Sequence, residues 1–557
     1  MLAELIADNI VVYGSPRDRS LLLQIPGALS QGNGVWAYPL GWGTCLALRA
    51  VLKEELEIGP ALLEWAEEYR RTTIALDSFR NGFHVGEFDE RLRPLQRAGV
   101  EFLHAGKHVV LGSEMRSGKT PQTLFALKEA DAYPALVVCP NSVMLQWADA
   151  VEDWTPGLKV SVVAGTEKKR LAALEPGSDI YIIGWANVYR HSRLSGYGSI
   201  ALSDKEKVPG ALNRLGLKAV VADEAHRALN PKAKQSRAMW YLMHNAEYRF
   251  ALTGTAVRNS GPEDVWGIGH LVAPYDYPVR SSYFDRYAHT GSNGWGFEVF
   301  GWKPEMKDEA LAVLDTHLLR HTYAEVFPDT PEWMEPDVRR ILLTPKQQKA
   351  YDEMKKHMFT LLETGVLLTG DPLVKLARLS QITCGMPVLD GSGQVIELDM
   401  PSSKVDALLE IVEDGEPLVV FAPSRKLIEL ASRQLTKRKV AHGLITGPIP
   451  IQERQASMQR FQAGEDQVIL CTTGAGSEGI TLNRSNRVLF LQRPFSLVEN
   501  MQAEARIGGV GQTRTMQTID LIAEGTLDAA VLEVVATKEE ALQEVLRDKD
   551  WVRRVLS

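Results

Sequence analysis

The residues best suited to chemistry stand in the sequence HVVLGSEMRSGKTPQTLFAL, which begins at His108. Its first apolar residues favour a short β-strand, a Gly/Ser turn follows, and from Ser117 onward the residues favour a helix. A turn between a strand and a helix aims backbone N–H groups and the helix N-terminus at an anion such as phosphate. The stretch therefore predicts a phosphate-binding loop.

Three consecutive residues of this loop suit a nucleotide and its metal ion. Gly118 lets the backbone approach the phosphates, Lys119 supplies a positive charge for the β- and γ-phosphates, and the Thr120 hydroxyl is placed to bind Mg²⁺. The strict pattern GxxxxGK[ST] has one departure, because Ser113 stands where it asks for its first glycine and Gly112 comes one position earlier. The flanking strand and helix still indicate a P-loop, with ATP and Mg²⁺ as the expected cofactors.

An acidic pair, Asp223 and Glu224, follows the apolar residues VVA further along the chain. We expect Asp223 to share the Mg²⁺ ion with Thr120, and Glu224 to orient and deprotonate the attacking water. The alternative is that the pair only caps the helix that follows. The P-loop upstream favours the catalytic interpretation.

Five apolar runs follow the P-loop and are separated by helical segments. They are ALVVCP at 135–140, KVSVVAG at 159–165, DIYIIGW at 179–185, KAVVADEAH at 218–226 and YRFALTGT at 248–255. Such runs are typical of a parallel sheet buried on both faces. Ligands bind at the carboxyl ends of such strands, and Asp223, Ser142 and Thr253 fall at those ends.

The composition limits the class of protein. A chain of 557 residues is expected to form roughly three or four domains. It shows no uncharged window of membrane-spanning length and no basic N-terminal signal, so we expect a cytoplasmic protein without a membrane partner. Four cysteines without CxxC spacing indicate neither a zinc site nor a disulfide framework. The formal charge of −8 means that any nucleic acid must meet a local basic surface.

The second half of the chain repeats the alternation of strands and helices from residue 401 onward. We therefore predict an α/β fold with two tandem parallel-sheet lobes and a small α+β N-terminal domain. In that domain a hairpin is expected within 22–40, with Gly32-Asn33-Gly34 as its turn, followed by helices over 43–55 and 60–71. The expected parts are an N-terminal domain at 1–85, a first lobe at 86–275, an inter-lobe insertion and linker at 276–400, a second lobe at 401–536 and a C-terminal brace helix at 537–557.

The motifs LRPLQRAGV, SEMRSGKT, VVCPNSVMLQW, VADEAH and ALTGT, in this order, resemble the first RecA-like domain of superfamily 2 ATPases of the Swi/Snf type. In the second lobe, TTGAGSEG and QAEAR resemble motifs V and VI. The linking segment resembles the compact annealing-helicase branch, and IPGA…VWAYPL weakly resembles the HARP-type module beside some annealing helicases. This resemblance implies two RecA-like lobes that close on ATP.

The resemblance also implies roles for particular residues. Residues expected at the nucleotide are Arg93, Gln96, Ser117, Gly118, Lys119, Thr120, Gly476, Gly479, Gln502 and Arg506. Residues expected at DNA phosphates are Asn141, Ser142, Ser424, Arg425 and Thr473. The catalytic group is expected to comprise Lys119, Glu224 and Arg506.

Motif VI contains a second departure. The Swi/Snf pattern QAxxRxxRxGQ places a second arginine three residues after Arg506, and this chain has Gly509 there. Arginines at this position stabilise charge on the transferred phosphoryl group. Either Arg506 suffices, or Arg514 takes part, or hydrolysis is weak.

Three further features leave alternatives open. The aromatic stretch YFDRYAHTGSNGWGFEVFGW is expected to form a surface hairpin, whose rings either stack on bases or, as we favour, pack a satellite core. The basic clusters Lys232, Lys234 and Arg237, and 437–439, are available for a local basic groove that meets DNA phosphates, but we favour solvated helix faces. The charged tail at 537–557 is expected to brace the lobes.

The favoured function is an ATP-dependent translocase on duplex or branched DNA, acting at forks, in branch migration or in strand annealing. One alternative is a strand-separating DNA or RNA helicase. Another is an ATP-binding nucleic-acid scaffold that hydrolyses weakly because of Gly509.

Overall fold

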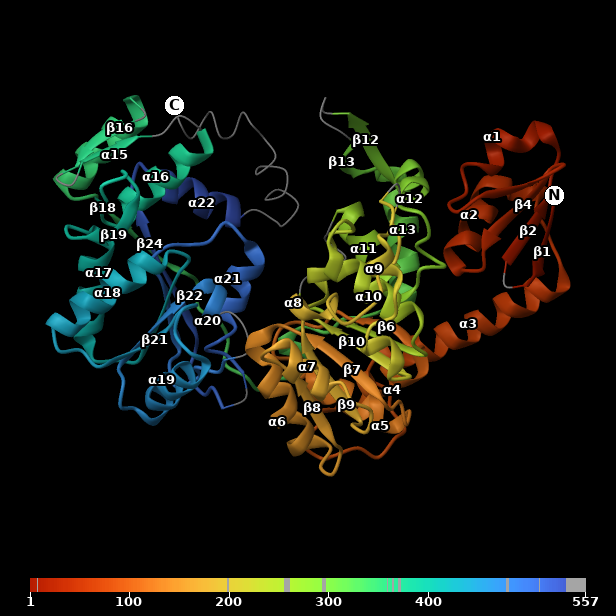
Figure 1. Ribbon diagram of the computed structural model, residues 1–557, viewed down its shortest axis with the longest axis horizontal. Helices are drawn as coiled ribbons and strands as arrows, with labels where there is room; N and C mark the ends of the chain where they lie inside the picture. The colour runs from red at the N-terminus through yellow and green to blue at the C-terminus, as the bar shows by residue number, and fades with distance from the viewer. Residues whose placement is uncertain are drawn as a thin grey trace. The chain divides into compact units, whose positions relative to one another are not determined.

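The computed structural model describes residues 1–7, 9–197, 200–254, 261–292, 297–357, 359–362, 365–368, 372–476, 480–509 and 511–536. The chain divides into two compact units, Met1–Pro328 and Asp329–Ser557. Each unit contains its own large parallel sheet (Figure 1). The boundary falls within the region 276–400 that the sequence assigned to an insertion and linker.

The N-terminal domain is a five-stranded sheet in the order β3-β4-β2-β1-β5. Its strands are β1 (Leu2–Ile6), β2 (Asn9–Tyr13), β3 (Leu29–Gly32), β4 (Val35–Pro39) and β5 (Glu57–Ile58). The expected hairpin is confirmed as β3 and β4, and its turn residues Asn33 and Gly34 both have positive φ, as a tight hairpin turn requires. The small helix α1 (Arg19–Leu22) occupies the start of the range predicted for this hairpin.

Two helices complete this domain. The helix α2 (Trp42–Leu52) packs on the sheet, and α3 (Pro60–Arg80) is longer than predicted. Leu62 near the start of α3 belongs to the domain's core, whereas Leu76 near its end packs into the core of the larger sheet. The helix α3 therefore ties the N-terminal domain to the rest of the first unit (Figure 1).

The larger sheet of the first unit has seven parallel strands in the order β14-β6-β11-β10-β7-β9-β8. They are β6 (His108–Leu111), β7 (Ala135–Cys139), β8 (Val160–Val163), β9 (Ile180–Gly184), β10 (Ala219–Asp223), β11 (Tyr248–Leu252) and β14 (Leu318–Leu319). All six strands predicted from the sequence are present, and the parallel pairing is confirmed.

Helices cover both faces of this sheet because alternate residues of each buried strand point to opposite sides. Val109 and Leu111 of β6 pack on one face with helices α4, α5 and α6, and Val110 packs on the other with α8, α10 and α11 (Figure 1). These helices are α4 (Pro94–Gly106), α5 (Lys119–Glu129), α6 (Met144–Trp154), α8 (Trp185–Val188), α10 (Lys234–His244) and α11 (Pro262–Val272).

The aromatic stretch after α11 forms α12 (Arg280–Tyr287) and the antiparallel hairpin β12 (Ala288–Ser292) and β13 (Phe297–Trp302). The rings of Tyr283, Phe284 and Tyr287 are buried in the core of the first unit. For these three rings the packing alternative is correct. The helix α13 (Pro304–His317) then leads into β14, which lies beside β6.

The second unit contains a six-stranded parallel sheet in the order β15-β24-β23-β20-β22-β21. Its strands are β15 (Asp337–Ile341), β20 (Leu418–Ala422), β21 (His442–Ile445), β22 (Val468–Thr472), β23 (Arg487–Phe490) and β24 (Gln517–Ala523). Helices α17 (Ser403–Ile411) and α18 (Arg425–Lys437) pack on one face, and α19 (Ile451–Ala463) and α21 (Leu497–Glu504) on the other. The predicted second parallel-sheet lobe is thereby confirmed.

Among the described residues, no helix combines the length and the apolar character needed to cross a bilayer. The predicted tail helix at 537–557 lies outside the described residues.

Candidate functional site

The P-loop joins β6 to α5, as the sequence predicted. Gly118 has a φ of +80°, and a Cβ atom there would collide with the Gln96 side chain, so both conformation and space require glycine. Lys119 Nζ donates hydrogen bonds to the backbone oxygens of Ser113 (2.8 Å) and Glu114 (3.0 Å). The ammonium group therefore lies over the loop, where it can meet a phosphate. Thr120 follows it in the first turn of α5.

Residues 318–323, here called the strap, lie along the P-loop. The Glu114 backbone N–H donates to the His321 carbonyl (2.9 Å), and the His321 N–H donates to the Ser113 hydroxyl (3.1 Å). The Glu114 carboxylate in turn accepts from the Tyr323 N–H (2.8 Å). Ser113 thus has a structural role at the position where the strict motif has glycine.

Asp223 ends β10 beside the P-loop. Its Oδ2 atom accepts a 2.8 Å hydrogen bond from the Trp147 indole, and its Oδ1 accepts from the Glu224 N–H at 3.0 Å. Burial, followed by the charge of Glu224, raises the pKa of Asp223 to about 6, while Trp147 and the charge of Lys119 act in the opposite direction. The Lys119 charge thus favours the ionised form of Asp223.

Glu224 occupies a sharp turn after β10. Its φ of +53° lies in the left-handed region that is uncommon for residues other than glycine, and such backbone strain is concentrated at functional sites. His226 Nδ1 lies 3.2 Å from Glu224 Oε2, and the Glu224 side chain is 20% exposed. Glu224 does not cap the next turn with its side chain, so the simple capping alternative is not supported.

The motif at the end of β11 also adjoins the P-loop. The Thr253 N–H donates to the Leu111 carbonyl (3.1 Å), and a Cβ atom on Gly254 would lie 2.7 Å from the side chain of Met115. Three strand ends, those of β6, β10 and β11, therefore meet at one edge of the sheet. Thr255 lies outside the described residues.

The predicted adenine-reading pair lies at the start of α4. Gln96 is buried, its Oε1 accepts from the Arg93 N–H (2.8 Å), and its Nε2 donates to the Ser117 carbonyl (2.9 Å). Gln96 thus fixes the P-loop through Ser117. The Arg93 guanidinium lies 5.9 Å from the centre of the Phe327 ring.

Among the residues predicted to contact DNA, Asn141 lies directly after β7, with its side chain against Gly184 at the end of β9. Ser142 is in the same short turn. Ser424 caps α18 through its hydroxyl, and Arg425 pairs with Glu429 at 3.2 Å.

Thr473 is 1% exposed, and its hydroxyl donates to Glu499 at 3.0 Å. Its side chain therefore faces the interior of the second unit rather than a surface that DNA could reach.

The motif V and VI residues lie in the second unit. Gly476 is tightly packed, since a Cβ atom there would lie 2.6 Å from Cys471, and Gly479 lies outside the described residues. Gln502 and Arg506 are buried at 5% and 9% exposure. The Arg506 guanidinium donates to the carbonyls of Gln502 (2.9 Å) and Ile480 (3.3 Å).

Gly509 has a φ of +107°, which is a conformation that only glycine adopts readily. The proposed substitute Arg514 pairs with Glu416 (3.1 Å) and donates to the Arg484 carbonyl (2.7 Å). The backbone conformation at position 509 thus favours glycine over the second arginine of the motif. Arg514 is engaged with neighbours in its own unit.

Sequence reasoning gave no role to two residues that organise these sites. Trp147 orients Asp223. The sequence feature that could have identified it is its position in the motif VVCPNSVMLQW. Arg493 forms ion pairs with Asp520 (2.6 Å) and Glu504 (2.8 Å) and thereby anchors the helix that carries motif VI. No local pattern distinguishes Arg493 from a surface arginine.

The donor set of the first unit suits a hard divalent cation. The carboxylate of Asp223 is held by an indole N–H and a backbone N–H, and the Thr120 hydroxyl stands next to Lys119 in the P-loop. Carboxylate and hydroxyl oxygens are ligands that Mg²⁺ accepts together with phosphate oxygens. Asp223 and Thr120 would hold the ion, which would neutralise charge developing on the phosphates.

Comparisons with known proteins give the family of this chain. Residues 95–386, just over half of the chain, match the model of the SNF2-related domain, and residues 403–511 match that of the helicase conserved C-terminal domain.

Among curated relatives, the chain is 24% identical over 491 residues to the SWI/SNF-related matrix-associated actin-dependent regulator of chromatin subfamily A-like protein 1 of Xenopus laevis. The match covers 87% of this chain and 47% of the relative. An uncharacterized ATP-dependent helicase of Mycoplasma genitalium is 22% identical, with 84% of this chain and 44% of the relative covered. The chain thus spans less than half the length of these relatives.

Among solved structures, the SWI2/SNF2 ATPase core of Sulfolobus solfataricus in complex with dsDNA is 22% identical. The TM-score is 0.38, with 85% of this chain and 99% of that chain covered.

Proposed function

The chain belongs to the family defined by the SNF2-related domain, and from that membership we propose that it is an ATP-driven translocase on double-stranded DNA. Relatives named ATP-dependent helicases support the use of ATP. Action at forks, in branch migration or in strand annealing is the finer part of this proposal.

The observation that carries the proposal is the meeting of three strand ends at one edge of the first unit's sheet. Lys119 lies over the P-loop, its charge favours the ionised form of Asp223, and Glu224 follows at a strained turn. A cation, a metal-binding acid and a second acid in this order are the parts that phosphoryl transfer to water requires.

Each of these residues has one task in the proposed reaction. Lys119 binds and orients the β- and γ-phosphates as a point charge. Glu224 accepts a proton from the attacking water and holds that water for in-line attack. Trp147 keeps the Asp223 carboxylate in one orientation. Arg506 is the candidate cation of the second unit for charge on the transferred phosphoryl group.

Steady-state ATP hydrolysis compared with duplex DNA, single-stranded DNA and RNA tests the proposal. We expect duplex DNA to stimulate turnover most. Stimulation mainly by single strands or RNA would instead favour a strand-separating helicase. Background turnover with every nucleic acid would favour the ATP-binding scaffold.

A further inference from the structure

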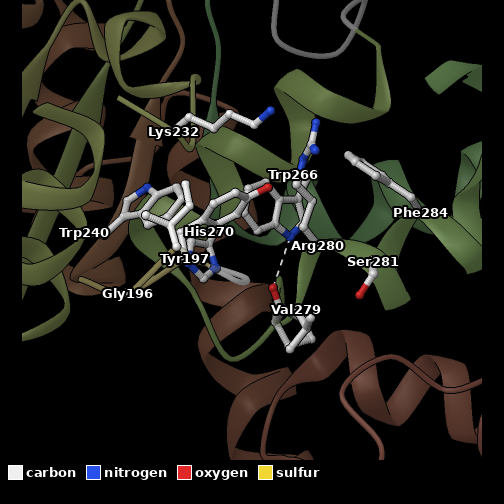
Figure 2. Close-up of a pocket in the computed structure, with 12 residues that line it drawn as sticks. Gly196, Tyr197, Lys232, Trp240, Trp266, His270, Val279, Arg280, Ser281 and Phe284 are labelled. Carbon is white, nitrogen blue, oxygen red and sulfur yellow. Dashed lines mark hydrogen bonds between the residues drawn. The ribbon is translucent and has the colours of Figure 1, made fainter. Parts of the chain in front are cut away.

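A cavity of about 590 Å³ lies in the first unit and shares no lining residue with the nucleotide site. It is lined by Gly196, Tyr197 and Ile200 and by residues of the helices α10, α11 and α12 (Figure 2). Its size is within the range of small-molecule binding pockets.

Aromatic rings form the floor of this cavity. Trp266 and His270 stack at 4.7 Å between ring centres, Trp240 meets His270 edge to face at 4.8 Å, and Tyr197 lies 5.8 Å from Trp240 (Figure 2). Burial lowers the pKa of His270 to about 4, so this imidazole is neutral at physiological pH. The floor is therefore uncharged, and Tyr197 and His270 are its partly exposed rings, because Trp240 and Trp266 are only 1% and 2% exposed.

Arg237 holds the backbone of Ser195, two residues before Tyr197. The Arg237 Nε donates to the Ser195 carbonyl (2.9 Å), and the Ser195 N–H donates to the Arg237 carbonyl (3.0 Å). Arg237 is only 3% exposed. The prediction of a solvated helix face is thus wrong for this residue, which instead positions the loop that carries Tyr197.

Two basic side chains, Lys232 and Arg280, line the mouth of the cavity. Lys232 is exposed. Arg280 pairs with Glu263 and lies 4.6 Å from the centre of the Phe284 ring. Figure 2 shows the ammonium of Lys232 and the guanidinium of Arg280 on the same side of the cavity, above the rings.

We propose that this cavity takes one unpaired nucleotide of DNA, with the phosphate at Lys232 and Arg280 and the base against the partly exposed rings of Tyr197 and His270. An uncharged aromatic floor under two basic side chains matches a nucleotide, since every base has a face that stacks on aromatic rings and every phosphate carries negative charge. The proposal rests on the proposed function for its choice of DNA as the ligand.

The position of the cavity gives such a ligand a connection to the catalytic residues. Helix α10 lies between β10, which ends at Asp223, and β11, and α11 follows Thr253 after β11. A nucleotide bound between α10 and α11 therefore contacts the helix that precedes β11 in the chain and the helix that follows it. The site would distinguish a duplex with a single-stranded junction from a continuous duplex.

Two measurements on the full chain test this site. The first measures Kd by fluorescence anisotropy for a blunt duplex and for the same duplex with a short single-stranded overhang. The second places one 5-iodouracil in the overhang, irradiates the complex, and maps the cross-linked residue by mass spectrometry. The variant is Lys232→Glu, and Lys168→Glu, which reverses an exposed charge on α7 (Glu167–Ala173), is the matched control.

We expect the cross-link at Tyr197 or His270, and we expect Lys232→Glu to reduce the preference for overhang over blunt duplex by roughly five-fold, the effect of replacing an exposed attractive charge pair by a repulsive one. Lys168→Glu should keep the wild-type preference. Cross-links only outside the cavity, or equal weakening of both DNAs by Lys232→Glu, would overturn the site. If the cavity instead binds an acidic peptide, the wild type should show no preference between the two DNAs, and this result would also overturn the site. The proposed function fails separately, if duplex DNA does not stimulate ATP hydrolysis by the wild type.

Discussion

Asp223 and Glu224 are neighbours in the chain, yet their surroundings give them different tasks. Asp223 is held by two N–H donors, from Trp147 and from its own neighbour, and this fixes its carboxylate for a metal ion. Glu224 stands on a strained turn with His226 beside it. The two acids should therefore respond differently to loss of charge.

Glu224→Gln should retain ATP and Mg²⁺ binding but lower turnover by at least about 100-fold, since the general base is lost. Asp223→Asn should instead weaken Mg²⁺-dependent nucleotide binding. Steady-state hydrolysis together with titration of a fluorescent ATP analogue separates the two effects. Glu129→Gln, at an exposed acid on α5, is the control. Loss of nucleotide affinity in Glu224→Gln would reverse the two assignments.

The Gly509 position tests whether motif VI can regain its second arginine. From the sequence alone, Gly509→Arg is predicted to raise turnover by adding a cation, provided that the loop accepts a side chain; a glycine required for positive φ would reverse the effect. The φ of +107° favours the second outcome. We expect Gly509→Arg to lower the free energy of unfolding by about 1–3 kcal/mol and to leave turnover no higher than wild type.

Gly391→Arg is a suitable control for that variant, because Gly391 is exposed, has open space around it and has no positive φ. The prediction is tested by urea unfolding and DNA-stimulated ATP hydrolysis of the wild type, Gly509→Arg and Gly391→Arg. A faster, equally stable Gly509→Arg enzyme would show that the loop accepts a side chain.

At the scale of elements, the strap explains the irregular P-loop. The buried His321 N–H depends on the Ser113 hydroxyl as its acceptor. Ser113→Gly restores the glycine of the strict motif, yet we expect it to reduce stability by about 1–3 kcal/mol, the cost of leaving a buried donor without a partner. Thermal unfolding with and without ATP measures this effect. Unchanged stability would show that the strap does not depend on this bond.

The packing of α10 against α11 should make stability depend on pH. Burial lowers the pKa of His244 to about 3 and that of His270 to about 4, and the unfolded chain has ordinary values near 6.5. Between these values only the unfolded chain takes up the protons, so stability falls as pH decreases below about 6.5, by up to about 1.4 kcal/mol per pH unit for each histidine.

His244→Gln should therefore reduce the loss of stability between pH 7 and pH 5, as measured by urea unfolding at several pH values. His289→Gln, at an exposed histidine of β12, provides the comparison. An unchanged pH dependence in His244→Gln would mean that His244 is not the group that titrates on unfolding.

The elements themselves were largely predictable, because continuous apolar runs between helical segments identify buried parallel strands. Local motifs also placed Lys119, Asp223 and Glu224 after the carboxyl ends of strands of one sheet. Contacts between distant segments were not predictable, such as the bond between Ser113 and His321 or the orientation of Asp223 by Trp147. Burial of Thr473 and Arg237 was likewise missed, since a polar residue in a loop or amphipathic helix gives no sign of its buried partner.

At the scale of the whole molecule, the proposed machinery is divided between two units with separate sheets and cores. The P-loop and both acids belong to the first unit, and Arg506 belongs to the second. In the proposed cycle ATP binding and hydrolysis change the relation between the units and so move the protein along DNA. This cycle predicts movement along a duplex without separation of its strands.

Displacement of the third strand from a DNA triplex tests that central claim most directly. We expect the wild type to release a labelled third strand from a triplex placed on a duplex track, only with ATP, while the two duplex strands stay paired. Lys119→Ala should release none, because it lacks the cation that orients the phosphates. Separation of the duplex strands, or duplex-stimulated ATP hydrolysis without release of the third strand, would contradict the account.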